Sequence, residues 1–245
     1  MVTTLYLVRH GALEGGGQKR YNGSIDIPMS ELGVGQIKAA SSFIADHMRS
    51  ADCAKYLSYL RDVHGSAGAG DCRDDSAPAK IQAVYCSDLT RAVTSAEIIA
   101  GPYGLAPVKI PALRERSFGA WEGMTFTEIK EKFPDEFEAW ARNPLRHSPV
   151  GGETTEEVKE RVVQALDTIL RDRGGDNIAV VAHGGVNRII LCHILGMPLE
   201  NIFRIEQDYA AVNVIEFWEK YPVVKLINGV RNAALGGNEE VSEGK

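Results

Sequence analysis

Short apolar segments alternate with segments of helical period along this chain of 245 residues, and this alternation restricts the fold most. Residues 2–8 (VTTLYLV) are rich in Val and Leu with little polar alternation, which is typical of a strand buried on both faces of a sheet. Similar runs predict strands at 81–86, 106–110 and 178–182, and a terminal hairpin at 212–218 and 223–227. Apolar residues at helical spacing predict helices at 30–48, with Ser30 as its N-cap, and at 89–101, 154–171 and 184–195. This order predicts a layered α/β domain.

We expect one domain over residues 1–232, because no linker or internal repeat divides the chain. Residues 51–79 interrupt the connection between a helix and a strand and are expected to be an insertion. The second half of this insertion is rich in Gly, Ser and Asp and is predicted to be a mobile loop. Residues 233–245 are small and acidic and are predicted to form a flexible tail.

Charge and cysteine content exclude several classes of function. The net charge is −6 and 44% of the residues are hydrophobic, which argues against a basic surface for nucleic acid or an anionic membrane. A local positive pocket for an anionic substrate remains compatible with this charge.

The N-terminus lacks the pattern of a signal peptide and no apolar run is long enough for a membrane span, so we expect a cytoplasmic, soluble protein. The chain has no C-x-x-C pair, which argues against a zinc site. We expect Cys86 and Cys192 to be core thiols and Cys53 and Cys72 to be reduced.

Polar residues stand where each predicted strand ends. Arg9 and His10 follow the first strand, the segment 87–91 with Arg91 follows the second, Glu115 follows the third, and His183 follows the fourth. Ligands of open α/β sheets bind at the carboxyl ends of the strands. If the strands are parallel neighbours, these side chains meet at one edge of the sheet.

Two guanidinium groups at one point suit a phosphate dianion. A histidine beside such a group can attack phosphorus, and neighbouring cations lower its pKa, so His10 is expected to be neutral and nucleophilic. Glu115 is the expected general acid for the leaving alcohol. Close backbone approach is expected at Gly11, Gly184 and Gly185, the last two at a helix N-terminus. An Arg-His pair at the end of a single strand more often has a structural role. Polar residues at the ends of all four predicted strands together favour a functional site.

Five ordered motifs carry a family resemblance. They are L-V-R-H-G, R-Y-N-G-S-I-D-I-P-M-S-E-L-G, Y-C-S-D-L-T-R-A-V-T-S-A-E-I-I, L-R-E-R-S-F-G-A-W-E-G and V-V-A-H-G-G. In this order they resemble the histidine phosphatase superfamily, which includes the cofactor-dependent phosphoglycerate mutases. The resemblance implies a three-layer α/β/α sandwich with a mostly parallel mixed sheet and no metal or organic cofactor. It implies that His10 is phosphorylated, that Arg9, Arg91 and His183 hold the phosphoryl group, and that Glu115 donates the proton.

Within this superfamily the chain looks like a phosphatase. The interval between Glu115 and His183 is short, whereas the mutases carry a long substrate-binding insertion there. Several motif details resemble alpha-ribazole phosphatases, so the expected substrate is a small phosphorylated metabolite, with alpha-ribazole 5′-phosphate as one candidate. The alternatives are a phosphoglycerate mutase and a non-catalytic phosphate-binding module. A monomer or a homodimer is expected.

The chain departs from the usual R-H-G-E-T-x-x-N motif. Ala12, Leu13 and Gly16 stand where the family has Glu, Thr and Asn, so an amide donor to the phosphoryl group is missing unless Asn22, next to Gly23, replaces it. Substrate specificity is expected to reside in residues 117–152. The candidates there are Phe118, Trp121, Trp140, Arg142, Arg146 and His147, of which Arg146 is the predicted substrate ligand.

Overall fold

The computed structural model describes residues 2–15, 20–49 and 80–231. The strands are β1 (Thr3–Arg9), β2 (Ala83–Cys86), β3 (Val108–Lys109), β4 (Asn177–Ala182), β5 (Val212–Phe217) and β6 (Pro222–Gly229). The α-helices are α1 (Glu31–Arg49), α3 (Thr90–Ala100), α4 (Phe126–Lys132), α5 (Pro134–Arg142), α6 (Thr155–Asp172) and α7 (Gly184–Ile194). The 3-10 helices are η1 (Gly101–Tyr103), η2 (Pro111–Leu113), η3 (Gly119–Trp121) and η4 (Leu199–Arg204). These elements confirm the predicted alternation.

The strands form one sheet in the order β3-β2-β4-β1-β5-β6. The pairs β3–β2, β2–β4 and β4–β1 are parallel, and β5 runs antiparallel to both β1 and β6. The predicted mixed sheet and terminal hairpin are therefore confirmed. Because four neighbouring strands are parallel, the residues that follow β1, β2, β3 and β4 all emerge at the same edge.

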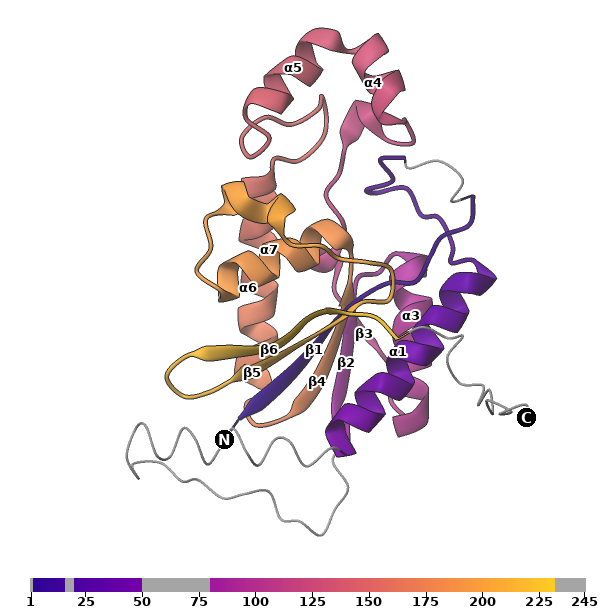
Figure 1. The fold of residues 1–245 in the computed structure, drawn as a ribbon, viewed down its shortest axis with the longest axis vertical. Coiled ribbons are helices and arrows are strands. Elements are labelled where there is room, and N and C mark those ends of the chain that lie inside the picture. The colour runs from indigo at the N-terminus through magenta and orange to yellow at the C-terminus, as the bar shows by residue number, and fades with distance from the viewer. Residues whose placement is uncertain (1, 16–19, 50–79, 232–245) are drawn as a thin grey trace, which may run out of the picture.

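The side chains of β1 alternate between two cores. Leu5 and Leu7 pack in a cluster with α6 and α7, whereas Tyr6 and Val8 pack in a cluster with α1 and α3. Figure 1 shows α6 and α7 on one side of the sheet and α1 and α3 on the other. The structure thus has the three layers that the family resemblance implied, and the burial of both faces explains the apolar sequence of β1.

Helix α6 illustrates how local sequence sets an element of this fold. It begins at a capping box, in which the Thr154 hydroxyl accepts from the Glu157 backbone N–H and the Glu157 carboxylate accepts from the Thr154 backbone N–H. Four apolar residues at helical spacing form its buried stripe: Val158, Val162, Leu166 and Ile169. Each such side chain contributes about 1.5–3 kcal/mol when fully buried.

The segment that holds α4 and α5 stands above the carboxyl ends of the strands (Figure 1). The buried Arg116 holds the two ends of this segment together. Its guanidinium donates to the Glu153 carbonyl at 2.7 Å, the His147 carbonyl at 3.0 Å and the Thr155 hydroxyl at 2.9 Å. One arginine at the start of the predicted specificity segment, 117–152, therefore joins it to residues at the end of the segment.

Some predictions lie outside the described residues. These are the structure of the insertion (51–79) and of the tail (233–245), and the state of Cys53 and Cys72. Cys86 and Cys192 are free and buried, as predicted. No helix in the described part of the chain is long and apolar enough to cross a membrane.

Candidate active site

A cavity of about 280 Å³ opens at the carboxyl ends of the parallel strands. Nine of the residues predicted at the site line it: Arg9, His10, Asn22, Gly23, Arg91, Glu115, His183, Gly184 and Gly185. These residues come from four strand ends and from the loop before α1. Two predicted residues, Gly11 and Arg146, are absent from its wall.

His10 follows β1 and is held in one tautomer. Its Nδ1 lies 2.8 Å from the Gly11 carbonyl oxygen, and a carbonyl can only accept, so Nδ1 carries the hydrogen. The lone pair is then on Nε2. Burial, followed by the charges of Arg9 and Arg91, lowers the pKa of His10 well below its ordinary value. The expected direction of this shift is correct, and burial is its larger cause. His10 is a neutral imidazole with a free ring nitrogen at physiological pH.

His183 caps α7 and is held in the opposite tautomer. The Arg91 Nε–H donates to His183 Nδ1 at 3.3 Å, so the hydrogen of the neutral ring is on Nε2. His183 is fully buried, and Nε2 has no hydrogen-bond partner among the described residues. Its ring centroid lies 5.1 Å from that of His10. Because buried donors are normally satisfied, this N–H is suited to an oxygen of a ligand in the cavity.

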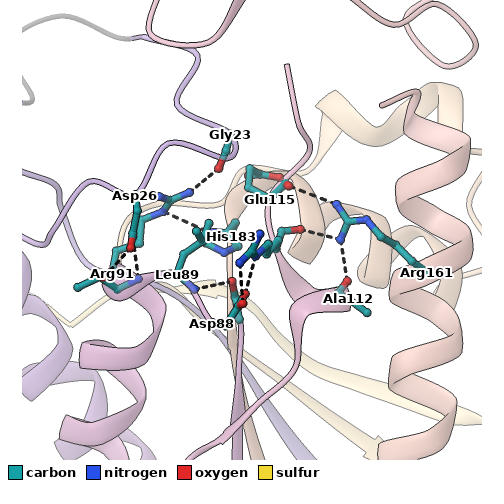
Figure 2. A network of polar contacts seen from close by, with 12 residues as sticks. Gly23, Asp26, Asp88, Leu89, Arg91, Ala112, Glu115, Arg161 and His183 are labelled. Carbon is teal, nitrogen blue, oxygen red and sulfur yellow. Dashed lines mark hydrogen bonds and ion pairs between the residues drawn. The ribbon is translucent and has the colours of Figure 1, made fainter. Parts of the chain in front are cut away.

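Arg91 lies in the first turn of α3 and is almost completely buried. Its terminal nitrogens donate to the carbonyl oxygens of Ile25 at 2.6 Å, Gly23 at 2.7 Å and Asn22 at 3.2 Å, and Figure 2 shows it between Gly23 and His183. No carboxylate pairs with Arg91 in the described part of the chain. Carbonyl groups fix the guanidinium without an ion pair, and the carboxylates of Glu115, Asp26 and Glu122 act on its charge only at longer range, which leaves the group able to bind an anionic ligand.

Arg9 is the last residue of β1. Its guanidinium donates to the Gln207 carbonyl oxygen at 2.5 Å and lies over the ring of Tyr209, 4.0 Å from the ring centroid. Burial lowers the pKa of Arg9, although the side chain stays charged at any physiological pH. Two cations, Arg9 and Arg91, and the neutral N–H of His183 therefore line the same cavity as His10.

The carboxylate of Glu115 is oriented by backbone donors. Its Oε2 accepts from the Gly185 N–H at 2.9 Å and its Oε1 from the Arg116 N–H at 3.0 Å. A Cβ on Gly185 would lie 2.5 Å from Glu115 Oε1, so a larger residue at this position would displace the carboxylate. Arg161 donates to the backbone carbonyls of Ala112 and Glu115 and fixes the segment that carries the acid (Figure 2).

The structure gives Gly11 a different role from the predicted contact with ligand. Its N–H faces the hydroxyl of Ser95 at 3.4 Å, and its carbonyl accepts from His10. A Cβ would lie 2.3 Å from the carbonyl oxygen of Gly33 on α1. The glycine thus permits close packing of two backbone segments and orients His10.

Arg146 is not brought to the cavity either. Its guanidinium pairs with Glu156 at 3.2 Å, and 75% of its side chain is exposed. Of the other candidates in 117–152, Phe118 and Trp140 line the cavity, whereas Trp121, Arg142 and His147 do not. Asn22 lines the cavity as well, and Gly16 lies outside the described residues. The replacement of the family amide by Asn22 stays a prediction.

Several residues of the cavity wall carry no signal in the sequence that marks them as part of a site. They are Tyr21, Arg188, Ile202, Phe203 and Tyr209, together with Leu13, Arg20, Arg116, Thr155 and Ile189. Tyr209 is the most prominent, because it contacts both Arg9 and the His10 ring, whose centroid is 5.6 Å away. No motif marks it, since it lies in an irregular segment before β5.

In residues 2–15, 20–49 and 80–231, no group of three or more His, Cys, Asp or Glu side chains is arranged to hold a metal ion.

Comparison with known proteins agrees with this geometry. The profile of the histidine phosphatase superfamily (branch 1) matches residues 5–61 and 60–229. The chain belongs to this superfamily. A bifunctional protein of Mycobacterium tuberculosis is 29% identical over 227 residues, which cover 92% of this chain and 54% of that protein. The chain therefore spans about half the length of this relative.

Two further proteins, both phosphatases by name, match over most of their length. Phosphoserine phosphatase 1 of Hydrogenobacter thermophilus is 28% identical, with 91% of each chain covered. The crystal structure of the alpha-ribazole phosphatase of Shigella flexneri superposes with a TM-score of 0.72 at 23% identity and covers 94% of this chain and all of that one (100%). The structural likeness establishes the fold.

Proposed function

We propose that this histidine phosphatase domain is a metal-independent phosphomonoesterase that works through a phosphohistidine on His10. The observation that carries the proposal is the fixed tautomer of His10, which leaves Nε2 free in a cavity that is also lined by Arg9, Arg91 and the unpartnered N–H of His183. A neutral nitrogen nucleophile that shares a cavity with two arginines and a neutral N–H donor suits attack on a phosphate dianion.

The reaction balances in two steps. His10 Nε2 attacks phosphorus, the bond from phosphorus to the ester oxygen breaks, and the protonated Glu115 gives its proton to the leaving alkoxide. The Glu115 carboxylate then takes a proton from water, the hydroxide attacks phosphorus, and the P–N bond breaks to release phosphate and free His10. Arg9, Arg91 and His183 bind the phosphoryl oxygens through both steps.

The wall of the cavity favours a small phosphorylated metabolite with a flat apolar group. Its aromatic members are Tyr21, Phe118, Trp140, Phe203 and Tyr209. Glu115 is the one carboxylate in the described part of the wall, so a substrate ammonium group would find no second acid to pair with. This composition supports alpha-ribazole 5′-phosphate over phosphoserine, the two kinds of substrate that the names of the relatives suggest.

The test is phosphate release from a panel of monoesters with EDTA present. The panel holds alpha-ribazole 5′-phosphate, phosphoserine, phosphoglycerates, sugar phosphates, nucleotides and an aryl phosphate. The variants are His10→Ala and, as a matched control, His193→Ala, which changes an exposed histidine of α7. We expect release by the wild type and the control and none by His10→Ala. Release by His10→Ala near the wild-type rate would refute the nucleophile.

Two alternative functions, a mutase and a non-catalytic binding module, predict different experimental results. Isomerisation of monophosphoglycerate with 2,3-bisphosphoglycerate, faster than phosphate release, would indicate a mutase. The short interval between Glu115 and His183 argues against this. Tight binding of phosphate analogues without any acid-labile phosphate trapped on His10 would indicate a non-catalytic binding module. The oriented carboxylate of Glu115 argues against that outcome.

A further inference from the structure

We propose that Tyr209 is a positioning residue whose ring face holds the Arg9 guanidinium in its phosphate-binding orientation. The inference deepens the proposed function, because it concerns the same phosphoryl site. Tyr209 also lies against the ring of His10, but the inference rests on its contact with Arg9.

Arg9 is held by two groups that carry no net charge. Its NH1 donates to the Gln207 carbonyl at 2.5 Å, and its Cζ lies 4.0 Å from the centroid of the Tyr209 ring. Arg9 has no carboxylate partner within ion-pair distance in the described residues, and its buried Nε has no hydrogen-bond partner there. A carboxylate would hold the side chain equally well but would neutralise it. A ring face and a carbonyl fix its direction and leave the positive charge for a dianion.

The segment that carries Tyr209 is itself anchored in the sheet. The side-chain amides of Gln207 and Asn213 exchange two hydrogen bonds, of 2.9 and 2.8 Å, and both residues are fully buried. Asn213 on β5 also donates to the Leu7 carbonyl on β1 at 3.0 Å. The anchor thus ties the segment to β1, the strand that ends at Arg9.

A second arginine holds the other end of this segment. Arg188 on α7 donates from Nε to the Ile205 carbonyl at 2.6 Å and from NH2 to the Glu206 carboxylate at 3.0 Å. Residues 205–213 therefore form a rigid support between α7 and β5. Because this support is rigid, Tyr209 can restrict the rotamers of Arg9 before any ligand arrives.

The experiment measures binding of orthovanadate by isothermal titration calorimetry, so it needs no turnover. The variants are Tyr209→Phe and Tyr209→Leu, each made with Arg9 intact and with Arg9→Met. The control Tyr103→Leu makes the same change at a half-buried tyrosine that packs in the α1/α3 cluster, away from the cavity. Thermal unfolding of every variant shows that it is folded.

We expect Tyr209→Leu to weaken vanadate binding about 5- to 30-fold, the range of a desolvated cation–π contact. Tyr209→Phe and Tyr103→Leu should bind as the wild type does, since the ring is what holds Arg9. In the Arg9→Met background, Tyr209→Leu should have no further effect, which a general structural role would not produce.

Three results would overturn the inference. They are wild-type affinity in Tyr209→Leu, a loss in Tyr209→Phe as large as that in Tyr209→Leu, and additive effects in the Arg9→Met background. The proposed phosphatase fails by a different result. A wild-type protein that binds vanadate with this pattern but releases no phosphate from any ester would refute the phosphatase and support the role of Tyr209.

Discussion

Acidification from pH 7.5 to 5.5 should destabilise this protein through the two histidines of the cavity. His10 and His183 are buried, and burial is the first cause that lowers the pKa of each well below 6.5. We therefore expect both rings to stay neutral in the folded protein in this range, whereas the unfolded chain binds a proton at each below pH 6.5. The unfolded state thus binds more protons, so stability is complete above pH 6.5 and falls as the pH drops.

The size of the effect follows from the linkage relation. Each histidine lowers the free energy of unfolding by about 1.4 kcal/mol per pH unit below 6.5, and the pair by about 2.7 kcal/mol between pH 7.5 and 5.5. This is a large part of the 5–15 kcal/mol that is typical of folded domains (about 0.1 kcal/mol per residue). Burial also lowers the pKa of the half-buried His47, which adds a smaller loss that is common to all variants.

The assay is urea unfolding followed by circular dichroism at several pH values and constant ionic strength. Phosphate buffers are avoided, because a ligand that binds the folded state would mask the loss. The double variant His10→Gln/His183→Gln should lose most of the pH dependence. Carboxylates with a lowered pKa, such as Asp88 and Glu153, also contribute to the free energy of unfolding. Their contribution is lost only below about pH 4.5, so it does not change between pH 7.5 and 5.5. A wild-type stability that is flat from pH 7.5 to 5.5, or an unchanged slope in the double variant, would refute the reasoning.

Three further predictions concern single residues. Glu115→Gln should slow hydrolysis of alkyl phosphates about 100-fold or more but spare an activated aryl phosphate, and equal losses in kcat on both would count against Glu115 as the acid. Arg146→Ala should leave kcat/KM unchanged and shift the free energy of unfolding by less than about 0.5 kcal/mol, because its ion pair is exposed; a large rise in KM would restore the predicted contact with substrate. Cys86 should resist alkylation at pH 8 in the folded protein, because burial raises the pKa of its thiol to about 11, and rapid labelling seen by mass spectrometry would contradict this.

The ends of the strands could be predicted because each is marked by a short local pattern, an apolar run followed by a polar residue. A run of apolar residues such as 178–182 must be buried on both faces, and the polar residue that follows it must leave the sheet at its edge. The third strand shows the limit of this reasoning. It was predicted at 106–110 and is only Val108–Lys109, yet it brings the chain to the same edge, so Glu115 reaches the cavity.

The sequence was least informative about residues whose surroundings come from distant parts of the chain. Gly11 was expected to approach the ligand, but in the structure the backbone of Gly33 on α1 packs against it and it does not line the cavity. Arg146 was expected to bind substrate, but it pairs with Glu156 on α6 outside the cavity wall, and its contact with substrate stays a prediction. Neither neighbour can be assigned from spacing, since each depends on how two elements pack.

The sequence by itself determined the family, the order of the strands and of the helices that cover the sheet, and which candidate catalytic groups reach the edge of the sheet. It could do so because hydrophobic period and strand-end position are properties of short segments. Only the tertiary structure decided the tautomers of His10 and His183, which depend on a carbonyl and a guanidinium beside them. It also decided that Tyr209 lies against Arg9, because an irregular segment is directed by its distant anchors and not by any period of its own.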